Sequence, residues 1–570
     1  MNKTLEILKF LVSKEQQKKI PLFTLFLIFA SALEIGALMT IYPVIKIFID
    51  PNYTLELNIF STIYLIGNSQ DSRLLIILFF FFLYIFKAFF LVFFNMKLNR
   101  FLTDTISNVN ERIYSSYLNL EYDNFLNKNI SNTVQIIQQE SYGLFFYLRA
   151  IITTVVDAVF FISVYLFLLI LEPLGTAVLS ISLVILYAFF YFLVLRSNMS
   201  WGKERVNSDL NLSKLVIESL GSLLNIRIGN KEEFFESFFI KESRNKSLVH
   251  SKQLTYEQMP RFFLEIILLI SVVSFIAILN LRNYDQGEFL TIIGILVAAL
   301  IRLIPSINSV ISSISIIKYR YSSLDLVYNE LFENVRNSMR LSNQESISFE
   351  SNLKLTDIEF SYNNNNSKIL DKLNLRINKG SFIGIVGESG SGKSTLINLL
   401  CGLLSPSSGE ILSDNLSIYQ NLRAWQSMIG YVGQKTFLLD ESIAANIAFG
   451  VKNDEIDYEK VQSCIKAVKL EPLMKKLKLG MDTSVGQDGS KLSGGQKQRI
   501  GIARALYSDP SIIIFDEATN SLDDKTEISL LTDITSFKGS KTLLFISHNL
   551  NSLEICDEIY ELRNKTLIKK

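Results

Sequence analysis

The sequence has few cysteines and almost no net charge, and both features exclude classes of protein. Three cysteines occur in 570 residues, Cys401, Cys464 and Cys556, with neither the spacing of a metal site nor the number of a disulfide framework. This usage is typical of a reducing cytosol. Lys plus Arg, 56 in all, balances Asp plus Glu, 55 in all, so no overall field attracts a polyanion such as nucleic acid.

Long apolar runs are nearly absent after about residue 310, although 49% of the whole chain is hydrophobic. The earlier part contains roughly six segments that can cross a bilayer, which takes about 20 residues: 20–48, 74–96, 150–171, 174–195, 262–281 and 289–310. The later part has short apolar strands and many turns. We expect a membrane-embedded all-α domain of six helices over 1–335, followed by a cytosolic α/β P-loop domain over 350–570.

The loops between the apolar segments differ in positive charge. Stretches 97–142 and 197–258 are rich in Lys and Arg, whereas the alternate loops carry little beyond Arg73 and Arg282. Because positive loops stay on the cytoplasmic side, we expect a multi-pass protein of a bacterial inner (cytoplasmic) membrane. Both termini and the α/β domain should be cytoplasmic, and the basic loops should continue the membrane helices well beyond the bilayer.

The first outer loop carries an apolar stripe over residues 55–66. Such a stripe is typical of a short helix at the membrane surface, and a packed loop is the alternative.

A phosphate-binding motif follows the strand predicted at 382–386. The residues Gly387–Ser394 read GESGSGKS, which is the P-loop pattern between a strand and a helix. Its backbone N–H groups converge on phosphate oxygens, Lys393 reaches the β- and γ-phosphates, and Ser394 ligates Mg²⁺. The expected ATP-binding residues here are Gly387, Glu388, Ser389, Gly390, Ser391, Gly392, Lys393, Ser394 and Thr395.

Two adjacent carboxylates end a second apolar strand, 512–515. We expect Asp516 to hold Mg²⁺ through water and Glu517 to polarise the attacking water as a general base.

The sequence Leu492-Ser493-Gly494-Gly495-Gln496 lies between these two motifs. A P-loop, LSGGQ and a strand ending in Asp-Glu, in this order, resemble the ATP-binding cassette (ABC) ATPases. The resemblance implies that ATP lies between the P-loop of one protomer and Ser493, Gly494, Gly495 and Gln496 of another, and hence a homodimer with ATP and Mg²⁺ as cofactors.

Smaller elements extend the resemblance. Tyr362 is similar to the aromatic residue that stacks on adenine, Gln434 to the glutamine that senses and ligates Mg²⁺, and His548 to the histidine that contacts the γ-phosphate. Ser521-Leu522-Asp523 resembles the D-loop. The arrangement resembles exporters, in which the turns at 121–131 and 220–231 would be coupling helices that rest on the cassettes.

The substrate has to be inferred from charges inside the apolar segments. Lys87, Arg261 and Arg302 either line a cavity for an anionic head group or pair with Glu34, Asp157 or Glu265.

The chain as a whole resembles the PglK-type lipid-linked oligosaccharide flippases, which implies ATP-driven flipping of a polyprenyl-pyrophosphate glycan to the outer leaflet. An exporter of peptide, lipid or hydrophobic drug is the alternative, although no cysteine precedes Cys401 to serve a fused cysteine peptidase. An ATP-gated regulator or channel is a third reading, which Glu517 and His548 argue against.

Overall fold

The computed structural model describes the chain except for residues 1, 42, 46–54, 60–61, 67–69, 172, 191–196, 282–285, 339–346, 363–366, 519–523 and 549. The chain forms two compact units. Unit 1 comprises Met1–Leu120 and Lys128–Asn337, and unit 2 comprises Glu121–Asn127 and Ser338–Lys570.

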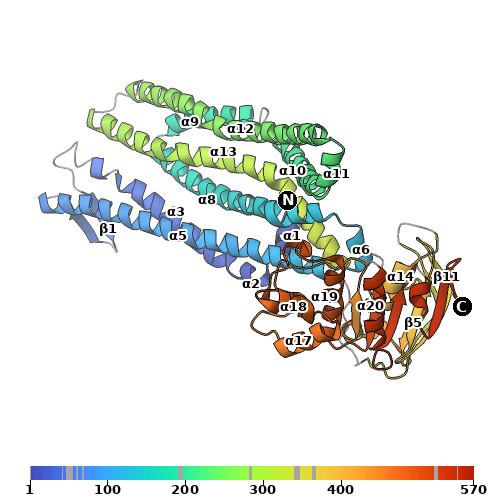
Figure 1. The fold of residues 1–570 in the computed structure, drawn as a ribbon. Coiled ribbons are helices and arrows are strands. Elements are labelled where there is room, and N and C mark those ends of the chain that lie inside the picture. The colour runs from blue at the N-terminus through green and yellow to red at the C-terminus, as the bar shows by residue number, and fades with distance from the viewer. Residues whose placement is uncertain are drawn as a thin grey trace. The chain divides into compact units, whose positions relative to one another are not determined.

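Unit 1 is built mainly from long helices (Figure 1). Three of them are far longer than the roughly 20 residues that cross a bilayer, namely α5 (Gln70–Leu118), α12 (Glu232–Leu281) and α13 (Gln286–Arg336). The others are α1 (Asn2–Leu11), α2 (Lys14–Gln17), α3 (Ile20–Met39), α7 (Ile130–Gln135), α8 (Ser141–Leu171), α9 (Pro173–Phe190), α10 (Asn198–Gly221) and α11 (Leu223–Ile228).

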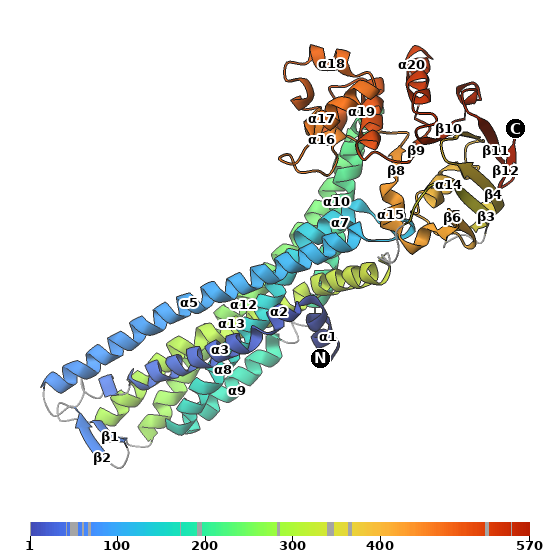
Figure 2. The same cartoon turned by 90° about the horizontal axis from the view of Figure 1, so that it is seen from below.

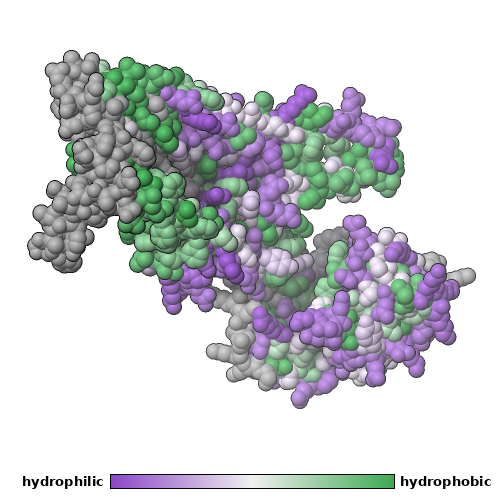
Figure 3. Space-filling view, turned by 90° about the vertical axis from the view of Figure 1, so that its left-hand side faces the viewer, coloured by the Kyte–Doolittle hydropathy of each residue, from purple (hydrophilic) through white to green (hydrophobic). Residues whose placement is uncertain are grey.

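Apolar side chains on the surface of these helices indicate contact with lipid. In the described part of the chain, four helical segments are long and apolar enough to cross a membrane: Lys14–Ala37, Leu74–Leu118, Ile130–Ile170 and Ala299–Arg336. They overlap four of the six predicted segments, and α9 and α12 occupy the other two. Exposed Leu, Ile and Phe side chains run along α5, and on the face in Figure 3 hydrophobic side chains gather at one end of unit 1.

The predicted first outer loop contains two paired strands, so the expected surface helix is not formed there. Strands β1 (Leu55–Ile59) and β2 (Thr62–Ile66) pair antiparallel, with Leu55 opposite Ile66 (Figure 2). The apolar residues of this stripe repeat with the period of a strand and not with that of a helix. Apolar Leu55, Leu57 and Ile59 alternate with polar Glu56 and Asn58, and this two-residue period is typical of a strand.

A buried ion cluster joins helices of unit 1 where two backbones cross closely. A Cβ on Gly202 of α10 would lie 2.1 Å from the carbonyl oxygen of Tyr319 on α13. Three residues on, Arg205 donates to both oxygens of Glu140 at 2.9 Å and to Asp209 at 2.9 Å. Glu140 ends the π-helical turn η1 (Ile136–Glu140). Because all three side chains are buried, their charges stabilise this crossing only as a set.

Unit 2 contains two sheets. A six-stranded sheet has the order β12-β11-β5-β10-β9-β8, in which only the pairing of β11 with β12 is antiparallel, and a four-stranded antiparallel sheet has the order β4-β3-β6-β7. The strands are β3 (Asn352–Phe360), β4 (Leu370–Asn378), β5 (Phe382–Val386), β6 (Ser408–Ser413), β7 (Leu416–Ser417), β8 (Ile429–Val432), β9 (Ile512–Asp516), β10 (Thr542–Ile546), β11 (Glu558–Arg563) and β12 (Thr566–Lys569).

The helices of unit 2 cover the parallel strands on two faces. They are α6 (Tyr122–Leu126), α14 (Lys393–Leu400), α15 (Leu422–Ser427), α16 (Ile443–Ile447), α17 (Tyr458–Ala467), α18 (Glu471–Lys476), α19 (Gly494–Tyr507) and α20 (Asp524–Thr535). Neighbouring residues of β9 belong to different cores, Ile514 with α14 and Phe515 with α19. Because strand side chains alternate between faces, α14 and α19 pack on opposite faces of the sheet.

Candidate nucleotide-binding site

The loop between β5 and α14 forms a cradle of backbone N–H groups. Gly390 and Gly392 have φ values of +82° and +106°, in the left-handed region that glycine adopts without steric cost. The hydroxyl of Ser391 is buried and has no hydrogen-bond partner among the described residues. A buried hydroxyl without a partner is costly, and a phosphate oxygen would satisfy it. The loop therefore fits a phosphate group.

Lys393 holds its ammonium group inside this loop. Its Nζ donates to the carbonyl oxygens of Gly387 at 2.7 Å and Glu388 at 3.0 Å, and it lies 3.9 Å from the Glu517 carboxylate. Ser394 and Thr395 follow in the first turn of α14.

Tyr362 lies beside the same helix. Its hydroxyl is 3.3 Å from the Thr395 hydroxyl, and its ring meets that of Phe360 edge to face at 4.9 Å. The ring is partly exposed, so it remains accessible to a base.

Asp516 ends β9 as a carboxylate suited to a cation. The hydroxyl of Tyr431 donates to its Oδ2 at 3.0 Å. Burial raises the pKa of the Asp516 carboxyl above its usual range, and the adjacent Glu517 carboxylate raises it further, against the effect of the Tyr431 hydrogen bond. A cation beside these two carboxylates would offset both costs. Asp516 and the Ser394 hydroxyl are oxygen ligands of the kind that Mg²⁺ prefers.

Glu517 is held in an unusual backbone conformation. Its φ is +49°, which is uncommon for a residue with a side chain and is found at functional sites. Its N–H donates to the carbonyl oxygen of Ile546 on β10 at 3.0 Å. Gln434 Nε2 donates to Glu517 Oε2 at 3.0 Å. The structure thus brings together Gln434 and Glu517, 83 residues apart in sequence.

Ser493 caps the N-terminus of α19. The Gln496 N–H donates to Ser493 Oγ at 3.3 Å, and the Ser493 N–H donates to Gln496 Oε1 at 2.9 Å, which together form a capping box. Gly494 and Gly495 begin the helix with their N–H groups unpaired within it. This terminus is a second candidate anion site, and it belongs to the opposite face of the sheet from the P-loop helix.

A family profile described as ABC transporter matches residues 370–520. This range contains the P-loop, the capped helix and the two carboxylates. The C-terminal unit therefore carries an ABC transporter domain. Such a domain binds ATP.

Two similar proteins match different shares of the chain. An ATP-dependent lipid A-core flippase of Ralstonia nicotianae is 36% identical over 38% of this chain and 37% of its own length. One of Coxiella burnetii is 29% identical over 67% of this chain and 66% of its own length. The chain spans little more than a third of most of the curated relatives that it matches.

A solved structure of another protein has a similar fold over nearly the whole chain. The structure of a bacterial Atm1-family ABC exporter with ATP bound has a TM-score of 0.75, covering 97% of this chain and 94% of its own at 21% identity. The predicted fold class, a membrane helical domain fused to an α/β P-loop domain in the exporter arrangement, is confirmed.

Sequence reasoning missed one residue of the ABC transporter domain. Tyr431 orients Asp516 through its hydroxyl, and no motif in the sequence pointed to it. Its signal was its place on β8, which pairs in parallel with β9 so that Tyr431 lies opposite Ile514, two residues before Asp516. Its neighbours Gly433 and Gln434 border a cavity of about 450 Å³ that also reaches Asp516.

Two other predicted elements of the site are His548 and the D-loop. His548 lies two residues after the end of β10 and is exposed. Residues 521–523, predicted as the D-loop, lie outside the described residues.

The two predicted coupling turns behave differently. The first contains α6, whose Tyr122 packs against the core of unit 2. The second contains α11 and belongs to unit 1, where Leu220, Leu224 and Ile228 are exposed by 65%, 72% and 72%.

The structure describes the side chains of two of the three predicted substrate cations. Lys87 is 3% exposed, and its Nζ lies 2.6 Å from Glu34 Oε2. Arg261 is exposed, 3.9 Å from Glu265 on the same helix. The side chain of Arg302 lies outside the described residues. For Lys87 the structure shows the pairing that was the alternative to an anionic head group.

Proposed function

We propose that this protein is an ATP-driven exporter that flips a lipid from the cytoplasmic to the outer leaflet of a bacterial cytoplasmic membrane. Three features support this: a phosphate cradle, a carboxylate oriented for hydrolysis, and long apolar helices in the exporter fold. The relatives named lipid A-core flippases favour a lipid over a peptide.

The observation that carries the proposal is the arrangement of Lys393, Gln434 and Glu517 around one loop. Lys393 would neutralise phosphate charge from within the cradle, where its ammonium group already lies. Asp516 and Ser394 would hold Mg²⁺, which supplies further positive charge to the phosphates. Glu517, oriented by Gln434, would accept the proton of the attacking water.

A homodimer completes the proposed site. Since α14 and α19 pack on opposite faces of one sheet, a single chain does not close its own capped helix over its own P-loop. A second copy would supply Ser493 and its two glycines to the phosphates. The exposed apolar residues of α11, including Leu224 and Ile228, would then dock on the partner's cassette.

Mixed dimers test both the ATPase activity and the sandwich. A chain with Lys393→Ala paired with a chain with Ser493→Arg should keep one intact site and retain about half of the wild-type ATP turnover if the sites are independent. Homodimers of either variant should be inactive, because each damages both sites. Turnover is measured on tandem-purified heterodimers. Mixed dimers as inactive as both homodimers would contradict independent composite sites, and a cysteine cross-link between positions 391 and 493 would show whether the sandwich itself forms.

A lipid-linked oligosaccharide is the finer candidate for the substrate. It follows from the resemblance to PglK-type flippases and requires cations for its pyrophosphate. Lys87 is paired with Glu34, so a pyrophosphate would compete with that carboxylate for the ammonium group. Flipping of a polyprenyl-pyrophosphate glycan by the purified protein separates the two.

A further inference from the structure

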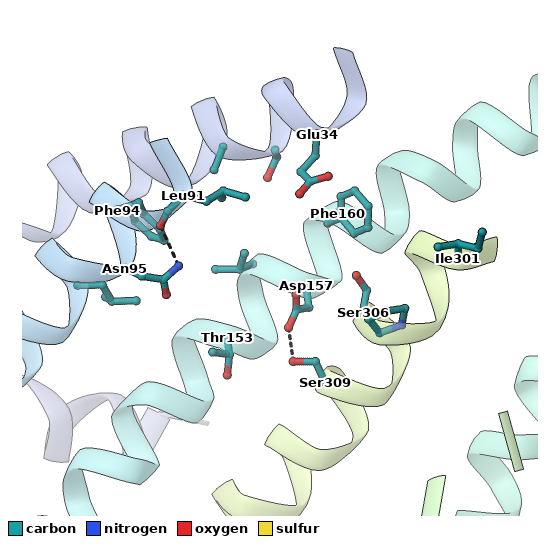
Figure 4. Close-up of a pocket in the computed structure, with 15 residues that line it drawn as sticks. Glu34, Leu91, Phe94, Asn95, Thr153, Asp157, Phe160, Ile301, Ser306 and Ser309 are labelled. Atoms are coloured by element: carbon teal, nitrogen blue, oxygen red, sulfur yellow. Dashed lines mark hydrogen bonds between the residues drawn. The ribbon is translucent and has the colours of Figure 1, made fainter. Parts of the chain in front are cut away.

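A cavity of about 470 Å³ lies among α3, α5, α8 and α13 of unit 1. This is within the range of small-molecule sites, about 300–1,000 Å³. Its wall combines apolar side chains, Leu91, Phe94, Leu98 and Phe160 among them, with two carboxylates, Glu34 and Asp157. Figure 4 shows both carboxylates pointing into the same space from different helices.

Among the described residues of the wall, the ionisable side chains are the two carboxylates. Glu34 is balanced by Lys87 at 2.6 Å, which lies outside the lining. Asp157 accepts a hydrogen bond from the Ser309 hydroxyl, which is a neutral partner. The described residues that line the cavity include no Lys or Arg. A carboxylate among membrane helices is costly unless it takes up a proton or a cation approaches it.

Further polar groups on the wall are available to a ligand. Ser306 is 7% exposed, lines the cavity, and its hydroxyl makes no recorded hydrogen bond in the described part of the chain. Asn95, across the cavity in Figure 4, donates its Nδ2 to the Leu91 carbonyl oxygen at 2.9 Å. This leaves its Oδ1 to accept. The cavity thus offers acceptors from three helices to a donor-rich group.

We propose that this cavity binds the protonated amine of an amphiphile. A primary ammonium carries three donors and one positive charge; Asp157 offers it a carboxylate and Ser306 a hydroxyl, while the apolar side chains that line the cavity receive the adjoining hydrocarbon. A pyrophosphate would instead bring negative charge beside Asp157. The amine would belong to the transported substrate, so this assignment of substrate class rests on the proposed function.

Binding of a matched pair of probes tests the assignment. The probes are a dansyl-labelled long-chain primary amine and its N-acetyl derivative, which lacks the charge. Binding to the full chain in zwitterionic lipid nanodiscs without nucleotide is measured by fluorescence anisotropy, with empty nanodiscs subtracted. The wild type should bind the amine at least about tenfold more tightly, as expected for one desolvated charge pair.

Variants with matched chemistry locate the site. Asp157→Asn should remove the preference for the amine, Asp157→Glu should retain most of it, and Ser306→Ala should weaken it a few-fold. Glu265→Gln is the control, because this exposed carboxylate on α12 does not line the cavity. Thermal unfolding of each variant is recorded in parallel, and the Ser306→Ala result still decides if Asp157→Asn does not fold.

Equal affinity of the wild type for both probes would overturn the assignment. So would an unchanged preference in folded Asp157→Asn, an unchanged preference in Ser306→Ala, or tighter binding of farnesyl pyrophosphate than of the amine. ATP hydrolysis is measured on the same samples. A preference for the amine without hydrolysis would support the amine site and contradict the proposed function. Hydrolysis without the preference would contradict the amine site and leave the proposed function intact.

Discussion

Replacing Glu517 with glutamine should lower ATP turnover by about 10²–10⁴-fold, the usual contribution of a general base. The amide keeps the shape of the side chain but cannot accept the proton of the attacking water. The phosphate cradle, Lys393 and Asp516 are untouched, so ATP binding should stay within a few-fold of wild type. Turnover is measured by phosphate release, and binding by a fluorescent ATP analogue.

The control for this experiment is Glu554→Gln, which makes the same chemical change at an exposed position of the cassette. It should leave turnover unchanged. Near wild-type turnover by Glu517→Gln would overturn the assignment of Glu517 as general base. Loss of ATP binding would instead mean that Glu517 is needed to hold Lys393, 3.9 Å away, inside the loop.

Replacing Lys87 with methionine should destabilise unit 1 by about 3–5 kcal/mol, the usual cost of breaking a buried ion pair. Lys87 is 3% exposed and its partner Glu34 is 15% exposed, so the carboxylate would be left without its ammonium partner. The double variant Lys87→Met with Glu34→Gln should recover most of the loss, because no charge is stranded. Thermal unfolding in nanodiscs measures both.

Lys97→Met is the matched control, since Lys97 is an exposed lysine on the same helix. Wild-type stability of Lys87→Met would refute the structural pairing. Flipping of a polyprenyl-pyrophosphate glycan by the wild type decides the finer substrate, and a folded variant of Lys87→Met that also carries Arg261→Gln and Arg302→Gln tests the role of the three cations in it. Full flipping would exclude these cations as its pyrophosphate site, and complete loss with intact basal ATPase would favour the lipid-linked oligosaccharide.

The parts of the candidate nucleotide site could be predicted because each part is one short, continuous stretch of sequence. Gly387–Ser394 is one loop, Ser493–Gln496 is one helix start, and Asp516 and Glu517 are neighbours. Backbone geometry within such short stretches depends on local residue types such as glycine. The hydrogen bond from Gln434 to Glu517 was not predicted, because it depends on how two strands lie side by side.

Contacts between membrane helices could not be predicted in the same way. Each apolar segment was readable from its length, but its rotation about its own axis was not, since these helices have apolar residues on all sides. The choice for Lys87 between a cavity and Glu34 depends on that rotation. The cavity between Glu34 and Asp157 depends on how each of the four helices α3, α5, α8 and α13 is rotated about its own axis.

The central claim is that ATP hydrolysis drives a lipid across the bilayer, and one measurement tests it most directly. Purified protein is reconstituted into liposomes containing a fluorescent lipid, and dithionite quenching reports the fraction in the outer leaflet. Wild-type protein should change that fraction only with ATP and Mg²⁺, and Glu517→Gln should leave it unchanged although it binds ATP. An equal change without ATP, or with Glu517→Gln, would contradict the account, as would steady hydrolysis without any redistribution of amine-bearing or glycan-bearing lipid.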